Sequence, residues 1–329
     1  MLKNILDLQL FATNTNRLAA TAAGYIGLTN ENAEIYEREM YDRLIPTLQW
    51  LKYGKKKELP RNSGDTVSIR RFENIAVSTT AITEGATPDG VDLTVVKRSA
   101  TVAEYGNYAI VTEKLDMIGL DDTISEVSKL FGENAGQSID EIVRDVVMAG
   151  TNVSYANGVA SRVLTAATIS YADILKMART MKKNKVKKIS MPEGGMGYIC
   201  LVSPDVAYDI KNLTEYKSFN QYDNSKQIRD GVIAKLAGIY FIEIDNAKIY
   251  PTGGAASVPV HLSYCIGDNA YMVPDIKGSS KPKIIVKEAG SAGTLDPLNQ
   301  RASIGWKAMF ATLRIDELSG LRFECAVSA

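Results

Sequence analysis

The sequence predicts an α+β fold in which one long helix joins a projecting β-hairpin to a larger mixed domain. Residues 121–150 place apolar side chains at steps of three and four, which predicts a helix with one apolar face. Residues 66–112 alternate between apolar and polar side chains on both sides of a polar stretch, which predicts two long antiparallel strands. From about residue 170 onward, short strands and helices are mixed, as in an α+β domain.

The N-terminal segment is expected to form an arm rather than a domain. Residues 1 to about 30 are rich in Asn, Thr, Ala and Leu without a sustained period, so they cannot bury much apolar surface by themselves. A short helical pattern covers Ala33–Tyr41, and Pro46 then interrupts it. An apolar patch and a lysine run follow, formed by Leu48, Trp50, Leu51 and Tyr53 and by Lys55, Lys56 and Lys57.

The two long strands are expected at Thr66–Val77 and Val91–Thr112, joined by the polar segment Ser78–Gly90. A slip in the alternation near Arg70-Arg71 indicates a bulge or a twist, and Gly106 predicts a bulge. A two-stranded hairpin is only marginally stable alone in water. A long hairpin that projects from a domain therefore requires a partner surface.

The long helix is expected over Asp121–Ala149. Asp121 and Asp122 offer an N-cap oxygen, and Gly150 can take the left-handed conformation that closes a last turn. Gly132 and Gly136 lie within the helix and indicate either local softness or the close approach of another backbone segment. The expected apolar stripe comprises Ile124, Val127, Leu130, Phe131, Ala135, Ile139, Ile142, Val143, Val146 and Val147.

A second helix is expected from Tyr171 to about Asn184, with Ile174, Leu175, Ala178 and Met181 on its inner side. It ends in the Lys182–Lys188 run, in which Lys182, Lys183, Lys185, Lys187 and Lys188 are cations. Solvated cations near a helix C-terminus are the favoured interpretation, because the run contains no aromatic residue. Contact with phosphates is the alternative.

The remaining elements are shorter. Residues 151–154 and 157–158 are expected to be loop, and Ser203-Pro204-Asp205 is expected to open a helix after a buried strand. A short helix is expected after Gly231, and Asp296–Gln300 is expected to form a turn. Strands are expected at residues 197–202, 239–244, 258–266, 270–273, 282–286, 304–315 and 321–327.

Composition excludes several classes of function. Lys and Arg balance Asp and Glu to a formal net charge of zero, which argues against a dedicated nucleic-acid-binding protein. Cys200, Cys265 and Cys325 are far apart and form no CxxC pair, so no disulfide framework or zinc motif is expected. No run approaches the ~18 apolar residues of a membrane span.

The sequence contains no motif typical of a catalytic site. His261 has no second His or neighbouring Cys, so it is expected to be structural rather than a metal ligand or part of a triad. The glycines of Gly194-Gly195-Met196-Gly197 precede a strand rather than a helix, which is the wrong context for a dinucleotide turn. Capping and turn roles account for the pairs Asp121-Asp122 and Asp316-Glu317. No catalytic, cofactor-binding or metal-binding residue is therefore predicted, and no enzyme.

Several motifs in order resemble the major capsid (coat) proteins of tailed bacteriophages, specifically the coat-protein family named after the coliphage N-four. Leu8 to Ala12 is similar to the start of phage structural proteins from Gram-positive hosts. A second motif is Thr83-Glu84-Gly85 with Thr87-Pro88-Asp89-Gly90, followed by Tyr105-Gly106-Asn107-Tyr108. A third is the end of the long helix, Asp140 to Asp145, with Ala149-Gly150-Thr151-Asn152 just after it. A fourth is Asp296 to Arg301, followed by Gly305-Trp306-Lys307.

The resemblance implies the Hong Kong 97-type capsid fold. In this fold residues 1–45 would be the N-terminal arm. Residues 46–112 would be the extended hairpin loop with its flanking strands, of which Thr66 to about Thr101 would overlie a neighbouring subunit. Residues 113–170 would form the peripheral domain with the spine helix 121–149. Residues 171–300 would form the axial domain, and 301–329 the strands that return to these sheets.

The resemblance further implies a shell protein that associates with itself in pentamers and hexamers and encloses double-stranded DNA. A portal and a separate scaffolding protein are expected, because the sequence has no room for a long N-terminal scaffolding region. The protein is expected in the virion, and in the host cytoplasm during assembly. Two alternatives remain open: an encapsulin-like compartment that holds cargo enzymes, and a cytosolic α+β enzyme with an unrecognised site.

Overall fold

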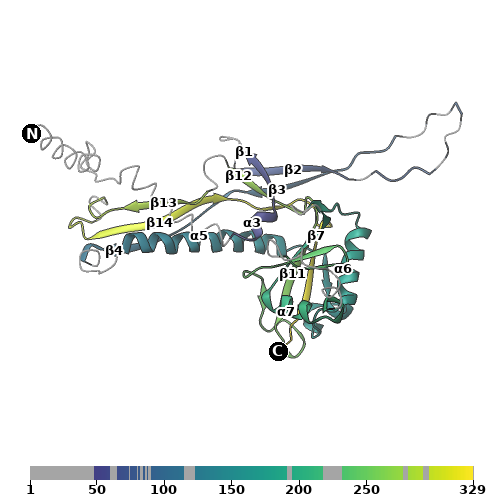
Figure 1. The fold of residues 1–329 in the computed structure, drawn as a ribbon. Coiled ribbons are helices and arrows are strands. Elements are labelled where there is room, and N and C mark those ends of the chain that lie inside the picture. The colour runs from purple at the N-terminus through teal and green to yellow at the C-terminus, as the bar shows by residue number, and fades with distance from the viewer. Residues whose placement is uncertain are drawn as a thin grey trace, which may run out of the picture.

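The computed structural model describes residues 48–59, 65–73, 75–79, 90–114, 123–190, 195–217, 232–276, 281–291 and 296–328, with residues 81, 84, 85 and 87 of the hairpin tip. Figure 1 shows a long body in which a helix runs beside extended strands, with a compact unit at one end. A hairpin projects beyond the body at that same end. The expected arm 1–45, the helix at Ala33–Tyr41 and the N-cap at Asp121-Asp122 lie outside the described residues.

The compact unit is built on an eight-stranded mixed sheet with the order β5-β16-β11-β7-β9-β8, in which β10 pairs with β11 and β6 with β7. The pairs β7–β9 and β5–β16 are parallel. The strands are β5 (Val153–Tyr155), β6 (Ile189–Ser190), β7 (Met196–Val202), β8 (Val232–Leu236), β9 (Ile239–Glu243), β10 (Ile249–Tyr250), β11 (Val260–Ile266) and β16 (Gly320–Ala326).

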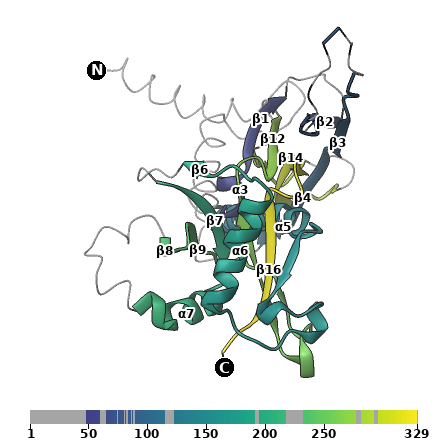
Figure 2. The same ribbon diagram turned by 90° about the vertical axis from the view of Figure 1, so that its right-hand side faces the viewer.

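Both faces of this sheet are covered, which explains why β7 is an almost continuous apolar run. Ile199 and Leu201 belong to the core cluster that also contains the end of the long helix. Cys200 and Val202 point to the opposite face, into a second cluster with α6 (Tyr171–Lys183) and α7 (Pro204–Asn212). Figure 2 shows these two helices in front of the sheet. The short 3-10 helices are η1 (Ala156–Gly158), η2 (Arg162–Leu164) and η3 (Ala255–Ser257).

The body consists of the helix α5 (Thr123–Met148) packed on the three-stranded sheet β13-β14-β4. The strands are β13 (Lys283–Lys287), β14 (Arg301–Phe310) and β4 (Ala103–Thr112). Trp306 on β14 is buried, and its Nε1 donates to Asn134 Oδ1 at 3.0 Å. The apolar stripe of the helix thus packs on the long strands of this sheet.

The predicted helix is confirmed with two corrections. Its buried stripe repeats every fourth residue and comprises Phe131, Ala135, Ile139, Val143 and Val147. Leu130 is wrong as a stripe residue, because its side chain is 56% exposed. Gly150 does not adopt a positive φ, and the chain passes through a bend at Thr151 before β5 begins at Val153. Gly132 and Gly136 are both buried, and the helix is continuous through them.

A smaller sheet, β1-β12-β15, and the hairpin β2–β3 complete the described chain. The strands are β1 (Lys55–Leu59), β12 (Tyr271–Ile276) and β15 (Leu313–Arg314), with β2 (Thr66–Phe72) and β3 (Val95–Thr101) in the hairpin. Before β1, the short helix α3 (Trp50–Tyr53) carries the predicted apolar patch into the core. Figure 1 shows the hairpin leaving the body close to β1 and β12.

The two predicted bulges are absent from these strands. The register of β2 with β3 is continuous from Thr66 to Phe72, and that of β4 with β14 is continuous from Ala103 to Thr112. Gly106 serves a different purpose, because a Cβ at this position would lie 2.5 Å from the carbonyl oxygen of Trp306. The glycine therefore permits a close approach of two backbones rather than an extra residue.

Three other expectations need correction. The short helix expected after Gly231 is strand β8, which turns into β9 through Ala237 and Gly238, both with positive φ. Such a turn matches the twist of a hairpin. Val153 and Ser154, expected in a loop, belong to β5. Leu175 is 46% exposed, and Met177 takes the expected inner position on α6.

The sheets also divide the chain differently from the expected ranges. Strand β13 falls within the range 171–300, yet it pairs with β14 in the body. Strand β5 falls within 113–170, yet it pairs with β16 in the compact unit. Strand β4 falls within 46–112, yet it pairs with β14 in the body. The single strand expected at 304–315 is divided into β14 in the body and β15 in the smaller sheet, whereas β16 lies in the compact unit.

Candidate assembly surfaces

The lone histidine lies in a structural setting. His261 is 4% exposed, and its Nδ1 lies 2.9 Å from Ser203 Oγ and 3.6 Å from a carboxylate oxygen of Asp205. Burial lowers the pKa of His261, although Asp205 and Asp209 oppose the shift. The serine and the carboxylate approach the same ring nitrogen, whereas a catalytic relay needs them on opposite nitrogens. Ser203 also caps α7 through Val206 N, so this contact ties β11 to the helix start.

The other candidate residues have structural partners. Asp316 accepts from Leu318 N and Ser319 Oγ, and Glu317 lies 3.2 Å from Arg314. Gly197 lies in strand β7, as the argument against a dinucleotide turn expects. Cys200, Cys265 and Cys325 are buried free thiols in the second core cluster. Among the described residues, no group of His, Cys, Asp or Glu could hold a metal ion.

The hairpin carries an unusual apolar surface. Phe72 is 64% exposed, and its cross-strand partner Val95 is 44% exposed. Large exposed apolar residues are normally scattered rather than gathered on one projection. We call the exposed set the hairpin surface, which consists of Phe72, Ile75, Val77, Val91, Leu93 and Val95.

The base of the hairpin is held by one apolar and one ionic contact. Val67 is buried in a small cluster with Met272 and Leu313. Arg71 forms an ion pair with Asp316, which lies just after β15. The pKa of Asp316 is lowered by Ser319 and Arg71, although its burial opposes this shift. Beyond these contacts the described hairpin residues extend away from the body (Figure 1).

The face of the body sheet that points away from α5 is hollowed. A groove of about 810 Å³ crosses β13, β14 and β4 on this face. Gly106 and Gly305 lie in its lining, so two positions at its centre have no side chain. The exposed apolar residues Tyr108, Ile110 and Ile285 line it, with Glu104 and Lys307 paired at 2.8 Å. We call this feature the outer groove.

A buried carboxylate on α5 joins the helix to the compact unit and to the chain segment that leads to the hairpin. Asp140 is fully buried and accepts from Trp50 N at 2.7 Å and from Asn246 Nδ2 at 3.3 Å. Gln49 gives α3 no side-chain cap, so Asp140 supplies the cap from another helix. Burial raises the pKa of Asp140 to about 6, although the hydrogen bonds from Trp50 and Asn246 oppose the shift.

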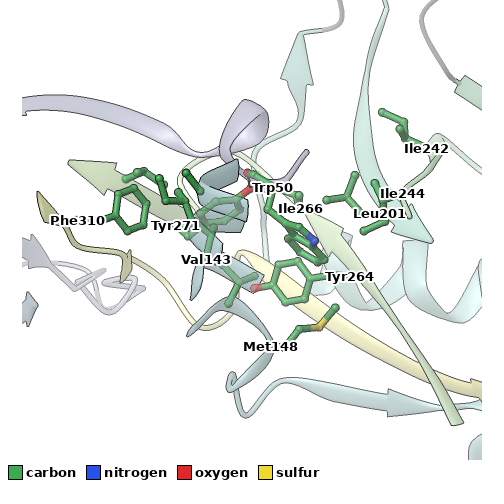
Figure 3. Packing of buried hydrophobic residues seen from close by; sticks show 14 of the residues in the cluster. Trp50, Val143, Met148, Leu201, Ile242, Ile244, Tyr264, Ile266, Tyr271 and Phe310 are labelled. Carbon is green, nitrogen blue, oxygen red and sulfur yellow. Dashed lines mark hydrogen bonds between the residues drawn. The ribbon is translucent and has the colours of Figure 1, made fainter. Parts of the chain in front are cut away.

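Figure 3 shows the packing around this junction. Trp50 lies between Tyr271 and Tyr264, with ring centroids 6.2 Å apart for Trp50 and Tyr264. Tyr271 donates its hydroxyl to the carbonyl of Trp50 at 2.6 Å. The Trp50 indole donates to the carbonyl of Asn246 at 3.1 Å. The short segment before β1 is therefore part of the core.

A second buried carboxylate, Glu324, stabilises the compact unit. Arg162 binds both of its oxygens, at 2.6 and 2.8 Å, and Arg322 lies 2.9 Å away. The Arg162 guanidinium also lies 3.9 Å from the ring centroid of Tyr250. The next residues of η2, Val163 and Leu164, are 69% and 57% exposed. The two hydrogen bonds between Arg162 and Glu324 therefore hold η2, with its exposed Val163 and Leu164, against strand β16.

The sequence matches the family model for phage capsid proteins over residues 94–322, which is most of the chain. The chain belongs to this phage capsid protein family. No curated protein sequence matches the capsid protein.

Solved capsid structures have the same fold as this capsid protein. The capsid of Ralstonia phage GP4 has a TM-score of 0.65 at 13% identity, over 85% of this chain and 91% of that one. The Cyanophage Pam1 capsid gives 0.65 at 14% identity, over 88% and 93%. The acid-stable capsid of Helicobacter pylori bacteriophage KHP30 gives 0.60 at 12% identity, over 83% and 87%.

These results confirm the expected Hong Kong 97-type fold and the assignment as a major capsid protein of a tailed phage. The capsid protein is therefore a structural component of the virion that associates with its own copies. No described helix is both long and apolar enough to cross a membrane.

Sequence reasoning did not identify Asp140 or Glu324 as buried groups. Asp140 lies in a polar stretch of an amphipathic helix, and Glu324 alternates with apolar residues on its strand. Their partners are distant in sequence: Trp50 is 90 positions from Asp140, and Arg162 is 162 positions from Glu324. The one signal in the sequence was that each acidic residue occupies a position on a face that its helix or strand buries.

Proposed function

We propose that many copies of the capsid protein build an icosahedral shell around double-stranded DNA and that the protein contributes no catalysis. The observation that carries this proposal is the hairpin surface, whose apolar side chains the subunit itself leaves uncovered. Burying one such side chain fully stabilises an interface by roughly 1.5–3 kcal/mol. Shell formation would supply that burial at every subunit.

The proposed binding site for the hairpin surface is the outer groove of a neighbouring copy. The groove presents Tyr108, Ile110 and Ile285 to solvent, and its two glycines leave room for an added chain. A hairpin of one copy laid on the groove of the next is a heterologous contact, which generates closed rings and shells when its rotations close.

The remaining parts would follow the same plan. The compact unit would act as the axial domain and meet other copies in pentamers and hexamers, and the body would act as the peripheral domain. Residues 1–45 would act as the arm. A separate scaffolding protein and a portal would join the copies in the host cytoplasm before DNA enters.

The test is assembly of the full-length protein, co-expressed with its scaffolding protein, followed by electron microscopy. We expect closed shells from the wild type and only soluble subunits from the double variant Phe72→Ser/Val95→Ser. The matched control is Ser68→Ala/Ser99→Ala, a cross-strand pair on the same face of the hairpin. Small discrete oligomers from the wild type under all assembly conditions would overturn the proposal, as would unimpaired shells from the double variant.

A further inference from the structure

A band of cations lies on the α6 side of the compact unit. Lys176, Arg179 and Lys182 follow one another at steps of three, so they form one stripe on the helix. The lysines that follow, from Lys183 to Lys188, are all exposed. In the part of the chain that the structure describes, none of these side chains forms an ion pair. Lys129, Lys211, Lys248 and Lys307 have acidic partners. Single exposed lysines such as Lys283 and Lys287 also lack an ion pair among the described residues, but they do not form a run.

The fold brings a second lysine run to the end of this band. The turn between β11 and β12 contacts both runs through neighbouring residues. Asp268 N donates to the carbonyl of Lys187 at 3.0 Å, and Asn269 Oδ1 accepts from Lys55 Nζ at 2.6 Å. Lys57 lies on the same face of β1 as Lys55, and Lys56 between them points to the other face of this strand; both are exposed. Two runs more than a hundred positions apart therefore meet at one turn.

Two acidic residues lie beside the meeting point. The Asp268 carboxylate accepts from the Asn269 amide at 2.8 Å, and the exposed Glu58 follows Lys57 on β1. The formal charge of the whole chain is zero. Because the protein is neutral overall, the cationic band means that positive charge is gathered on one part of the surface, not that the chain has an excess of it. Such segregation attracts a polyanion to one face.

We infer that this cationic band, Lys176 to Lys188 on and after α6 together with Lys55 to Lys57 on β1, is the surface of the capsid protein that contacts the phosphate backbone of duplex DNA. The band contains no exposed aromatic residue between its lysines, so it holds phosphates rather than stacked bases. Contact is independent of DNA sequence and weakens steeply with salt, because each neutralised phosphate releases counterions. The inference rests on the proposed function, in which the shell encloses DNA.

The test measures binding of the soluble full-length subunit to a random-sequence duplex of about 30 base pairs by fluorescence anisotropy, at several salt concentrations. The band variant is Lys182→Gln/Lys183→Gln/Lys187→Gln. The control, Lys129→Gln/Lys211→Gln/Lys248→Gln, removes the same charge from lysines that have acidic partners and lie outside the outer groove. Each lost phosphate contact flattens the plot of log affinity against log salt by about 0.9. We expect the band variant to flatten it by about 2 to 3 and the control to leave it within about 0.5.

A third variant, Lys55→Gln/Lys56→Gln/Lys57→Gln, tests whether the two runs act together, and we expect it to flatten the plot as well. Equal losses in the band variant and the control would overturn the inference, because net charge alone would then explain binding. Absence of wild-type binding at low salt would overturn it too, as would tighter binding of an acidic polypeptide than of the duplex. Shell formation by each variant is scored separately by electron microscopy, so failure of assembly is distinguished from failure of DNA contact.

Discussion

At the residue scale, Asp140 makes the stability of the subunit depend on pH. Its pKa is about 6 in the folded chain against an ordinary value of 3.8. A raised folded-state pKa adds stability that is complete below the unfolded pKa and is lost as the pH rises through 6. Lowering the pH from 7 to 5 should therefore stabilise wild type relative to Asp140→Asn by about 1 kcal/mol.

Urea unfolding of both proteins at pH 5, 6 and 7 measures this difference. Burial lowers the pKa of His261 in the folded chain, so His261 also makes stability depend on pH in this window. Its contribution is the same in wild type and Asp140→Asn, and it therefore cancels in the difference between their free energies of unfolding. A difference that stays constant across these pH values would show that Asp140 is not protonated in the fold.

The glycine at Gly106 gives a second prediction at this scale. An added Cβ would lie 2.5 Å from a backbone oxygen that cannot move without distorting β14. Gly106→Ala should destabilise the subunit by about 1–3 kcal/mol, as overpacking in a sheet does. Gly90→Ala is the control, because a Cβ added there would have no neighbouring atom within 4 Å. Thermal unfolding compares the two, and equal melting temperatures would contradict the close approach.

At the element scale, the ion pair between Arg71 and Asp316 limits the movement of the hairpin. Arg71 is 42% exposed, so its loss should cost the subunit less than about 1 kcal/mol. Arg71→Gln should nevertheless raise hydrogen exchange in β2 and β3 while leaving α5 and the eight-stranded sheet unchanged. Arg98→Gln, on the same hairpin but without a described ion pair, is the control. Equal exchange in both variants would show that the apolar base alone fixes the hairpin.

The same scale shows how far the sequence could predict the fold. The helix α5 was predictable because its local period matches the face that it buries. The strands β7 and β16 were predictable because short, mostly apolar runs are typical of strands that are covered on both faces. Strand β8 was not, since the turn at Ala237 uses positive φ at a residue that rarely adopts it. The bulge at Gly106 was wrong because a glycine in a strand has two explanations, and only the partner strand distinguishes them.

The candidate surfaces were only partly predictable. The hairpin and its need for a partner followed from alternation, because a long two-stranded projection is marginal by itself. The outer groove did not, because it forms where Gly106 and Gly305, far apart in sequence, become neighbours across two strands. The meeting of Lys55 with the Lys182–Lys188 run depends in the same way on the fold of a distant turn.

At the scale of the whole molecule, the boundary between an arm and the core falls before Trp50. This side chain is fully buried, and its segment binds Asp140, Asn246 and Tyr271. Deleting residues 1–30 keeps all these contacts, so we expect a folded, soluble subunit that assembles poorly. Deleting residues 1–53 removes the Trp50 side chain and leaves Asp140 without the backbone donors of α3. Losing a buried Trp costs about 3–5 kcal/mol, so this deletion should unfold the subunit or lower its melting temperature sharply.

The pair of deletions separates folding from assembly within one chain. Circular dichroism melts report on the subunit, and electron microscopy of co-expressed particles reports on the shell. If residues 1–30 act between subunits, their removal lowers the yield of closed shells while the melting temperature stays within about 2 °C. If the variant that lacks residues 1–30 unfolds, those residues belong to the core of the subunit. If it forms normal shells, those residues have no role in assembly. A stable subunit after the longer deletion would show that the junction at Asp140 serves the hairpin rather than the fold.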